Sequence, residues 1–266
     1  MAQFDDRYAQ VGSSARTGAV VDEGLRAYML SVYNYMAGGV ALTGLVAYLL
    51  STMTVTTDPA LAATSATGAV LALSRGMFLT PLGAALYASP LQWVVMLAPL
   101  GLVFLLSFRV YKMSLTGAQI AFWAFAAAMG LSLSSIFLVF TGQSIARVFF
   151  ISAAAFAGLS VFGYTTRKDL SGWGSFLIMG VIGMIIAGLV NLWLHSTALQ
   201  FAISVMGVLA FAGLTAYDTQ RIKDSYFEVV GNTALAGQMA IMGALSLYLD
   251  FINLFVSLLN LFGERE

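Results

Sequence analysis

Long apolar stretches alternate with short polar connections from about residue 25 to the end of the chain. Each stretch holds at least ~18 residues, which is the length that a helix needs to cross the hydrocarbon core of a bilayer. We expect seven membrane-spanning helices, at residues 25–50, 91–108, 115–140, 145–164, 174–194, 198–217 and 239–262. The pattern therefore predicts an all-α membrane protein, built as a seven-transmembrane helix bundle.

One connection, residues 51–89, is much longer than the others. Its part at residues 60–73 is mildly apolar, but Thr, Ser and Gly interrupt it. An eighth span is one interpretation of this segment. We favour the other, an extracytoplasmic loop that is interfacial or partly re-entrant.

Composition supports a membrane protein and excludes several functional classes. Hydrophobic residues make up 60% of the 266 positions and charged residues 9%, whereas about a quarter of the residues in a soluble domain are charged. Twelve basic and twelve acidic side chains cancel, so no net field favours nucleic acid. The sequence has no cysteine, which excludes disulfides, thiolate metal sites and a cysteine nucleophile.

Basic residues predict the orientation, because they concentrate in cytoplasmic loops. With seven spans, nine basic residues fall on the side of the membrane that holds the N-terminus, and three fall on the other side. The N-terminus is therefore expected in the cytoplasm and the C-terminus outside it. Residues 1–24 are polar and lack the apolar core of a signal peptide, so we expect a flexible cytoplasmic tail ahead of a transmembrane domain at residues 25–263.

Asp250 is an acidic residue that lies deep within a predicted span. It stands in the segment SLYLDFINLF, with apolar residues on both sides. A charged side chain at that depth costs at least ~2.5 kcal/mol on insertion scales, so such a residue usually faces a cavity or a partner. We favour a functional role over the alternative, a protonated acid that hydrogen-bonds a neighbouring helix for packing alone.

Asp218 is the natural partner of Asp250, although by itself it also fits an ordinary acid at a helix end. It closes the sixth span in TAYDTQRIKD, and the two aspartates lie 16 positions on either side of Ala234. If the sixth helix continues through the polar segment and the chain turns near Gly231 and Asn232, each aspartate lies ~24 Å from the turn. The two carboxylates would then meet at one height on neighbouring antiparallel helices.

Two facing carboxylates in a low-dielectric site cannot both ionise easily. They titrate as a pair and can share a proton at low pH. When deprotonated, their oxygens form a hard site suited to Ca²⁺. Asp218 and Asp250 thus predict a proton-sensitive cation site, with Ca²⁺ as the expected ion and with no resident cofactor.

Other polar residues around this pair have weaker assignments. Arg109 ends the second span, where it is a topology determinant or reaches the acids as a gating cation. Tyr248 and Asn253 flank Asp250 on its own helix and are assigned supporting roles, and Asn253 is expected to hydrogen-bond across helices. His195, the single histidine, is expected to be an interfacial side chain rather than a pH sensor or metal ligand.

Four segments resemble a known family: VDEGLRAYMLSVYNYMAGG, SPLQWVVMLAPLGLVFLLSF, LTAYDTQRIKDSY and ALSLYLDFINLFVSLLNLFG. Over residues 21–263 the chain resembles the bacterial branch of the Bax inhibitor-1 (transmembrane Bax inhibitor motif) family. The last two segments are the specific ones. The resemblance implies six helices around a central C-terminal helix, in a bacterial inner membrane, with Asp218 and Asp250 as the pH-sensing pair of a calcium leak. Some members keep another charged side chain within the second helix, whereas this span has none before Arg109.

The leading hypothesis is therefore a pH-sensitive calcium leak without enzymatic activity. An intramembrane aspartyl protease is a rival, because two aspartates lie on adjacent spans and one follows a tyrosine. Such enzymes hold the second aspartate in a Gly-x-Gly-Asp context, whereas here the segment is LYLD. The resemblance also implies an interaction role, since bacterial relatives are implicated as modulators of a membrane-bound ATP-dependent protease.

Overall fold

A computed structural model describes residues 2–64, 69–73 and 76–265. Its long helices are α1 (Ala2–Thr54), α3 (Leu91–Arg109), α4 (Leu115–Leu133), α5 (Gly142–Thr165), α6 (Ser171–Leu194), α7 (Thr197–Val229) and α8 (Thr233–Phe262). Its short elements are β1 (Val55–Thr56), η1 (Pro59–Leu61), β2 (Phe78–Leu79), α2 (Pro81–Tyr87), η3 (Val110–Lys112) and η4 (Ser134–Leu138). Within the described residues, seven helical segments are long and apolar enough to cross a membrane, so the predicted number of spans is confirmed.

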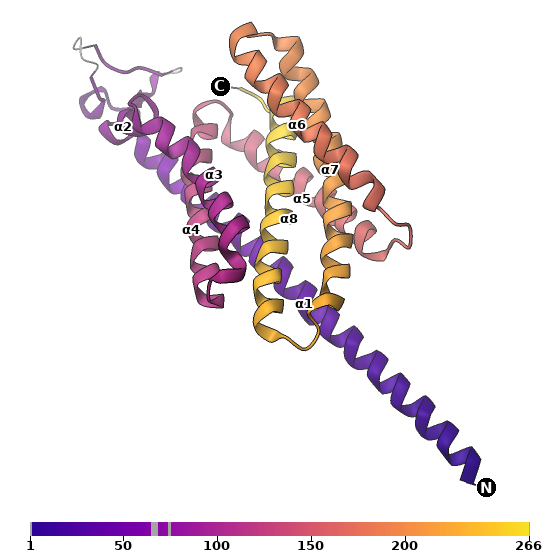
Figure 1. Ribbon diagram of the computed structural model, residues 1–266. Helices are drawn as coiled ribbons and strands as arrows, with labels where there is room; N and C mark the ends of the chain where they lie inside the picture. The colour runs from indigo at the N-terminus through magenta and orange to yellow at the C-terminus, as the bar shows by residue number, and fades with distance from the viewer. Residues whose placement is uncertain (1, 65–68, 74–75, 266) are drawn as a thin grey trace.

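Successive spans run in opposite directions, so the bundle has two distinct ends (Figure 1). The end that holds the turn between α7 and α8 is termed the turn end. It also receives the α3–α4 and α5–α6 connections, which carry basic residues such as Lys112 and Arg167. The opposite end holds the C-terminus of α8 and the long connection between α1 and α3. It is termed the C-terminal end.

Helix α8 is the centre of the bundle, as predicted for the C-terminal span. Its most apolar window is 67% buried, whereas the corresponding window of α6 has no buried residue. Helices α1, α4, α5 and α7 all contact α8. From α4, the rings of Phe122 and Phe125 pack edge-on against Tyr248, with centroid distances of 6.4 and 5.0 Å. The exposed apolar side chains of α6 are those expected of a lipid-facing helix.

Small polar residues fix the starts of several spans. The first backbone N–H groups of a helix have no partner within it, and lipid supplies none. A side-chain oxygen just before the helix accepts one of them at Ser114 for α4, Thr141 for α5, Ser196 for α7 and Asn232 for α8. These caps explain why the connections can be short without leaving unpaired backbone groups at the membrane surface.

The long connection forms a small folded cap and no eighth span in its described part. Strands β1 and β2 pair antiparallel, with Val55 opposite Leu79, and α2 follows them. Within residues 60–73, the described residues contain the end of the single turn η1 and two isolated bridges, Thr64 with Val70 and Ala72 with Phe78, but no long helix. The loop interpretation is therefore the one that the structure supports.

The N-terminal segment is helical. Helix α1 begins at Ala2, and its first part projects beyond the bundle (Figure 1). The apolar span within it begins at Glu23, close to the predicted start at residue 25. Residues 2–24 contain no proline, so no residue there blocks extension of the helix.

Candidate functional site

Helices α7 and α8 form an antiparallel hairpin that carries both predicted aspartates. Helix α7 continues from Asp218 to Val229, the chain turns at Gly231 with φ of +92°, and Asn232 caps α8. Only glycine adopts such a φ without strain, so this turn sets the register of the hairpin. The carboxyl groups of Asp218 and Asp250 consequently lie within hydrogen-bonding reach of each other.

The two aspartates have different surroundings. Asp250 is only 4% exposed, and its Oδ2 atom is buried without a hydrogen-bond partner among the described residues. The side chain of Asp218 is 13% exposed. An unpaired carboxylate oxygen in such a place is costly unless a proton or a cation compensates it.

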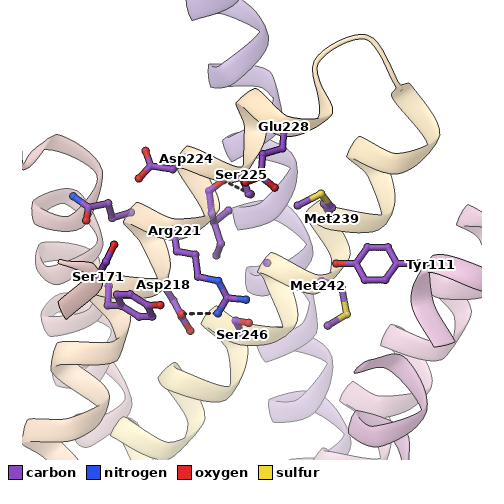
Figure 2. A pocket seen from close by; sticks show the side chains of 14 residues that line it. Tyr111, Ser171, Asp218, Arg221, Asp224, Ser225, Glu228, Met239, Met242 and Ser246 are labelled. Carbon is purple, nitrogen blue, oxygen red and sulfur yellow. Dashed lines mark hydrogen bonds and ion pairs between the residues drawn. The ribbon is translucent and has the colours of Figure 1, made fainter. Parts of the chain in front are cut away.

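A cavity of about 440 Å³ between α7 and α8 leads from the turn end to Asp218 (Figure 2). Asp224 and Glu228 line it closer to the turn, and Asp218 lines its inner part. From α8, Met239, Met242, Gly243 and Ser246 contribute to the wall. Asp250 lies one helical turn beyond Ser246 and does not line the cavity. The cavity therefore ends at Asp218, and Asp250 lies behind it.

Arg221 is the cation at this site. Its guanidinium lies 3.7 Å from the Asp218 carboxylate, and its side chain is 65% exposed in the cavity mouth. Arg221 is one of the nine basic residues that were counted for the orientation, and its i, i+3 spacing from Asp218 brings the two side chains together on α7. Arg109 is exposed at the end of α3 and is not among the residues that line the cavity.

Helix α7 is also anchored to α5 and to the α5–α6 connection. The side chain of Gln220 accepts a hydrogen bond from the backbone N–H of Leu170 and donates one to the carbonyl of Lys168, both at 2.8 Å. Lys223 donates to the carbonyl of Tyr164 at 2.9 Å. The polar run after Asp218 therefore has two roles: these residues fix α7 in place, while Arg221 faces the cavity.

A chain of hydroxyl groups adds to this anchoring inside the membrane. Tyr33 of α1 lies 2.6 Å from Ser160 of α5, which lies 3.0 Å from Thr219 of α7. Thr219 also donates to the carbonyl of Thr215 within α7. Thr219, which directly follows Asp218, is thus linked to α5 and, through Ser160, to α1.

The residues predicted to support Asp250 on α8 do not contact its carboxyl group directly. Tyr248 is fully buried, and its hydroxyl lies 2.6 Å from that of Thr43, which donates to the Ala126 carbonyl at 2.8 Å. Asn253 donates to the carbonyl of Leu249 at 2.8 Å. Our prediction of a cross-helix bond for Asn253 is therefore wrong, because the carbonyl one turn earlier in its own helix satisfies the amide.

The two aspartates alone form a small set of donors for a metal ion. Among the described residues, no group of three or more His, Cys, Asp or Glu side chains could hold a metal ion. Ca²⁺ takes six to eight oxygen ligands, and Asp218 and Asp250 supply carboxylates from two residues only. Water in the cavity would have to supply the remaining oxygens. The sole histidine, His195, is exposed at the end of α6, far along the chain from this pair.

Comparison with known proteins gives a consistent set of relatives. The profile of the family described as inhibitor of apoptosis-promoting Bax1 matches residues 25–266. An uncharacterized protein of Caulobacter vibrioides is 44% identical over 266 residues, which cover all of both chains. The inner membrane protein YbhL of Escherichia coli K12 is 41% identical over 91% of this chain and 94% of its own length. An uncharacterized protein of Deinococcus radiodurans is 36% identical over 91% of this chain and 92% of its own.

Proposed function

Because this chain belongs to the Bax inhibitor-1 family and is a multi-pass protein of the bacterial inner membrane, we propose that it is a proton-sensitive cation leak. Ca²⁺ is the principal ion, and Asp218 and Asp250 form the gate. The observation that carries the proposal is the buried, unpartnered Oδ2 atom of Asp250, beside a second carboxyl group at the end of a cavity.

Protons and cations compete for the pair. Two ionised carboxylates at this separation repel each other, and burial makes the repulsion strong. The proton is best placed on Asp250, which is enclosed, while Asp218 stays ionised beside Arg221. When the proton leaves, a divalent cation from the cavity can replace it and stabilise both charges. Ca²⁺ binding should therefore weaken as the pH falls.

The route on the far side of Asp250 is closed. Beyond this residue, towards the C-terminal end, the rings of Phe251 and Phe255 pack against Phe149 of α5, with centroid distances of 5.6 and 6.1 Å. The cavity opens a route for an ion from the turn end as far as Asp218, and these aromatic contacts would block its passage beyond Asp250. In our proposal this arrangement is the closed state, and conduction requires α8 to move relative to α5.

Ion flux into vesicles tests the proposal. The full-length protein is purified and reconstituted into liposomes that contain a Ca²⁺-sensitive dye, and influx is followed from pH 5 to pH 8. The proposal predicts protein-dependent influx whose half-saturating Ca²⁺ concentration rises as the pH falls. Influx equal to that of protein-free liposomes at every pH would overturn it.

A second role, as an interaction partner of a membrane-bound ATP-dependent protease, is favoured by the projecting part of α1 (Figure 1). A helix that extends beyond the bundle offers a surface that the spans do not need. Deleting residues 1–24 separates the two roles, because the leak should persist without this segment whereas binding through it should not. Co-purification of the protease with the full chain, and its loss on deletion, would support the second role.

Our proposal gives the aspartate pair no catalytic role. An intramembrane protease must bring an unfolded stretch of substrate backbone to both carboxyl groups. Asp250 is almost fully enclosed, and the preceding residues Leu247, Tyr248 and Leu249 lack the glycine that would free the backbone there. Incubation of the reconstituted protein with a transmembrane peptide should therefore yield no cleavage.

A further inference from the structure

A second cavity, of about 520 Å³, lies in the half of the bundle towards the C-terminal end. Helices α1 and α5 form its sides, η4 forms its end and α8 forms its floor. Its lining residues are Val40, Thr43, Gly44, Ala47, Tyr48, Leu133, Ile136, Phe137, Gly142, Ile145, Ala146, Phe149, Phe251, Ile252 and Phe255. This cavity is termed the α1–α5 groove.

The groove opens towards the bilayer between two membrane spans. Gly44 of α1 and Gly142 of α5 are exposed, and a Cβ atom built on either would meet no atom within 4 Å. Tyr48 and Ala146 are also exposed at its mouth. Its floor, by contrast, consists of Phe251, Ile252 and Phe255, which are buried residues of the central helix.

The walls of the α1–α5 groove carry almost no polar group that could hydrogen-bond to water. The hydroxyl of Thr43 is used twice, since it donates to the Ala126 carbonyl and contacts the hydroxyl of Tyr248. The other lining groups are glycine or apolar and aromatic side chains, apart from the exposed Tyr48. A buried water needs two to four polar partners, so water does not fill this groove stably.

An empty groove is also unfavourable, because its lining atoms would lose dispersion contacts over a space of this size. At this depth of the bundle the surrounding solvent is the hydrocarbon of the bilayer. A flexible methylene chain can enter between Gly44 and Gly142, restore those contacts and leave no polar group unpaired. Among vacuum, water and hydrocarbon, hydrocarbon is the favoured occupant.

We propose that an acyl chain of a membrane phospholipid occupies the α1–α5 groove and contacts α8 at Phe251 and Ile252, directly after Asp250. The site requires no contact with the lipid headgroup, so it binds the acyl chain whatever the charge of the headgroup. It does not depend on the leak activity, and its test uses binding alone. Its position means that a lipid chain supports the central helix immediately beside the aspartate pair.

Photolabelling tests the proposal. The full-length protein is reconstituted with a phosphatidylcholine that carries a diazirine near the middle of one acyl chain, irradiated, digested and mapped by mass spectrometry. Surface lipids can label exposed faces such as that of α6, but they cannot reach Phe251 or Ile252. We expect label on the α8 peptide that holds these residues. Label on α6 with none on α8 would overturn the proposal.

Two filling variants, each with a matched control, make the test specific. Gly44→Leu and Ala146→Phe place side chains into the groove, whereas Gly183→Leu on α6 and Ala154→Phe on α5 place them on exposed helix faces outside it. The filling variants should reduce α8 labelling several-fold, and the controls should leave it unchanged. Using both positions keeps the test valid if one variant fails to fold. Undiminished α8 labelling in a folded filling variant would contradict occupancy of the groove.

Discussion

The guanidinium of Arg221 lies 3.7 Å from the carboxylate of Asp218, one turn earlier on α7. Asp218, which lines the cavity, therefore has a positive charge beside it. Asp250, which is enclosed behind Asp218, has none beside it among the described residues. Because most of the Arg221 side chain is exposed, it can leave Asp218 without leaving solvent. A cation arriving through the cavity therefore competes with Arg221 as well as with the proton.

Replacing Arg221 by Gln should make the site bind Ca²⁺ more tightly. The variant removes a charge that competes for Asp218, and an ion pair with an exposed partner is worth about 0.2–1 kcal/mol. That range corresponds to a fall of up to about fivefold in the half-saturating Ca²⁺ concentration for influx. The measurement is Ca²⁺ influx into liposomes at pH 7.

Arg109→Gln is the matched control, because Arg109 also lies at the turn end but does not line the cavity. It should leave the half-saturating concentration unchanged. If Arg109→Gln had the larger effect, the gating cation would be Arg109, as one interpretation of the sequence allowed.

Loss of the Thr43 hydroxyl should destabilise the bundle without involving the aspartates. Thr43→Val leaves the buried hydroxyl of Tyr248 without the partner that it has at 2.6 Å, which costs about 1–3 kcal/mol. Tyr248→Phe removes the other side of the same contact. The double variant should lose less stability than the sum of the two single variants.

Thermal unfolding in detergent measures these differences. Thr52→Val is the control, because the Thr52 hydroxyl is exposed and bonds only to a carbonyl of its own helix. Strict additivity of the two core variants would show that the Thr43–Tyr248 contact contributes nothing.

Gly163 should tolerate no larger side chain. A Cβ atom at this position would collide with the backbone carbonyl of Ala216, whereas at Gly158, on the same helix, it would meet nothing within 4 Å. Gly163→Val should therefore separate α5 from α7 and cost at least about 1–3 kcal/mol. Gly158→Val should unfold at the wild-type temperature. Equal unfolding temperatures for both variants would contradict the close approach of these helices.

The orientation in the membrane is tested with reporter fusions. Nine basic residues on one side against three on the other predict that the N-terminus and the Asp169 connection lie in the cytoplasm. A phosphatase fused to the C-terminus should be active outside the cytoplasm, and a fluorescent protein fused there should not fluoresce. The reverse pattern would show that the positive-inside argument fails for this chain.

The spans and the aspartate pair could be predicted because each depends on a local pattern. Apolar length alone defines a membrane helix, and an acid such as Asp250 within one stands out. The position of Gly231 then sets the hairpin that brings Asp218 to it. The structure moves the span boundaries by only a few residues at most ends, but α7 continues as helix to Val229.

The contacts between side chains on different helices could not be predicted, because the sequence does not tell which helix faces pack against each other. Nothing in the sequence near Thr43 indicates that its hydroxyl meets Tyr248, which is 205 positions away. Asn253 illustrates the same limit, since an amide in a span can bond within its helix or across to another. The α1–α5 groove arises from small residues on two distant segments, and glycines alone do not distinguish a groove from tight packing.

The most direct test of the proposed gate is Ca²⁺ influx from pH 5 to pH 8 for the wild type, Asp218→Asn and Asp250→Asn in the same liposomes. Each variant leaves one carboxyl group beside a neutral amide, so its pH profile should show a single titration step in place of the two steps of a coupled pair. Asp250→Asn should weaken Ca²⁺ binding more, because it removes the more enclosed carboxyl group, and Asp218→Asn should mainly change gating at the cavity end. Identical influx and identical pH profiles for all three proteins would contradict a gate formed by this pair.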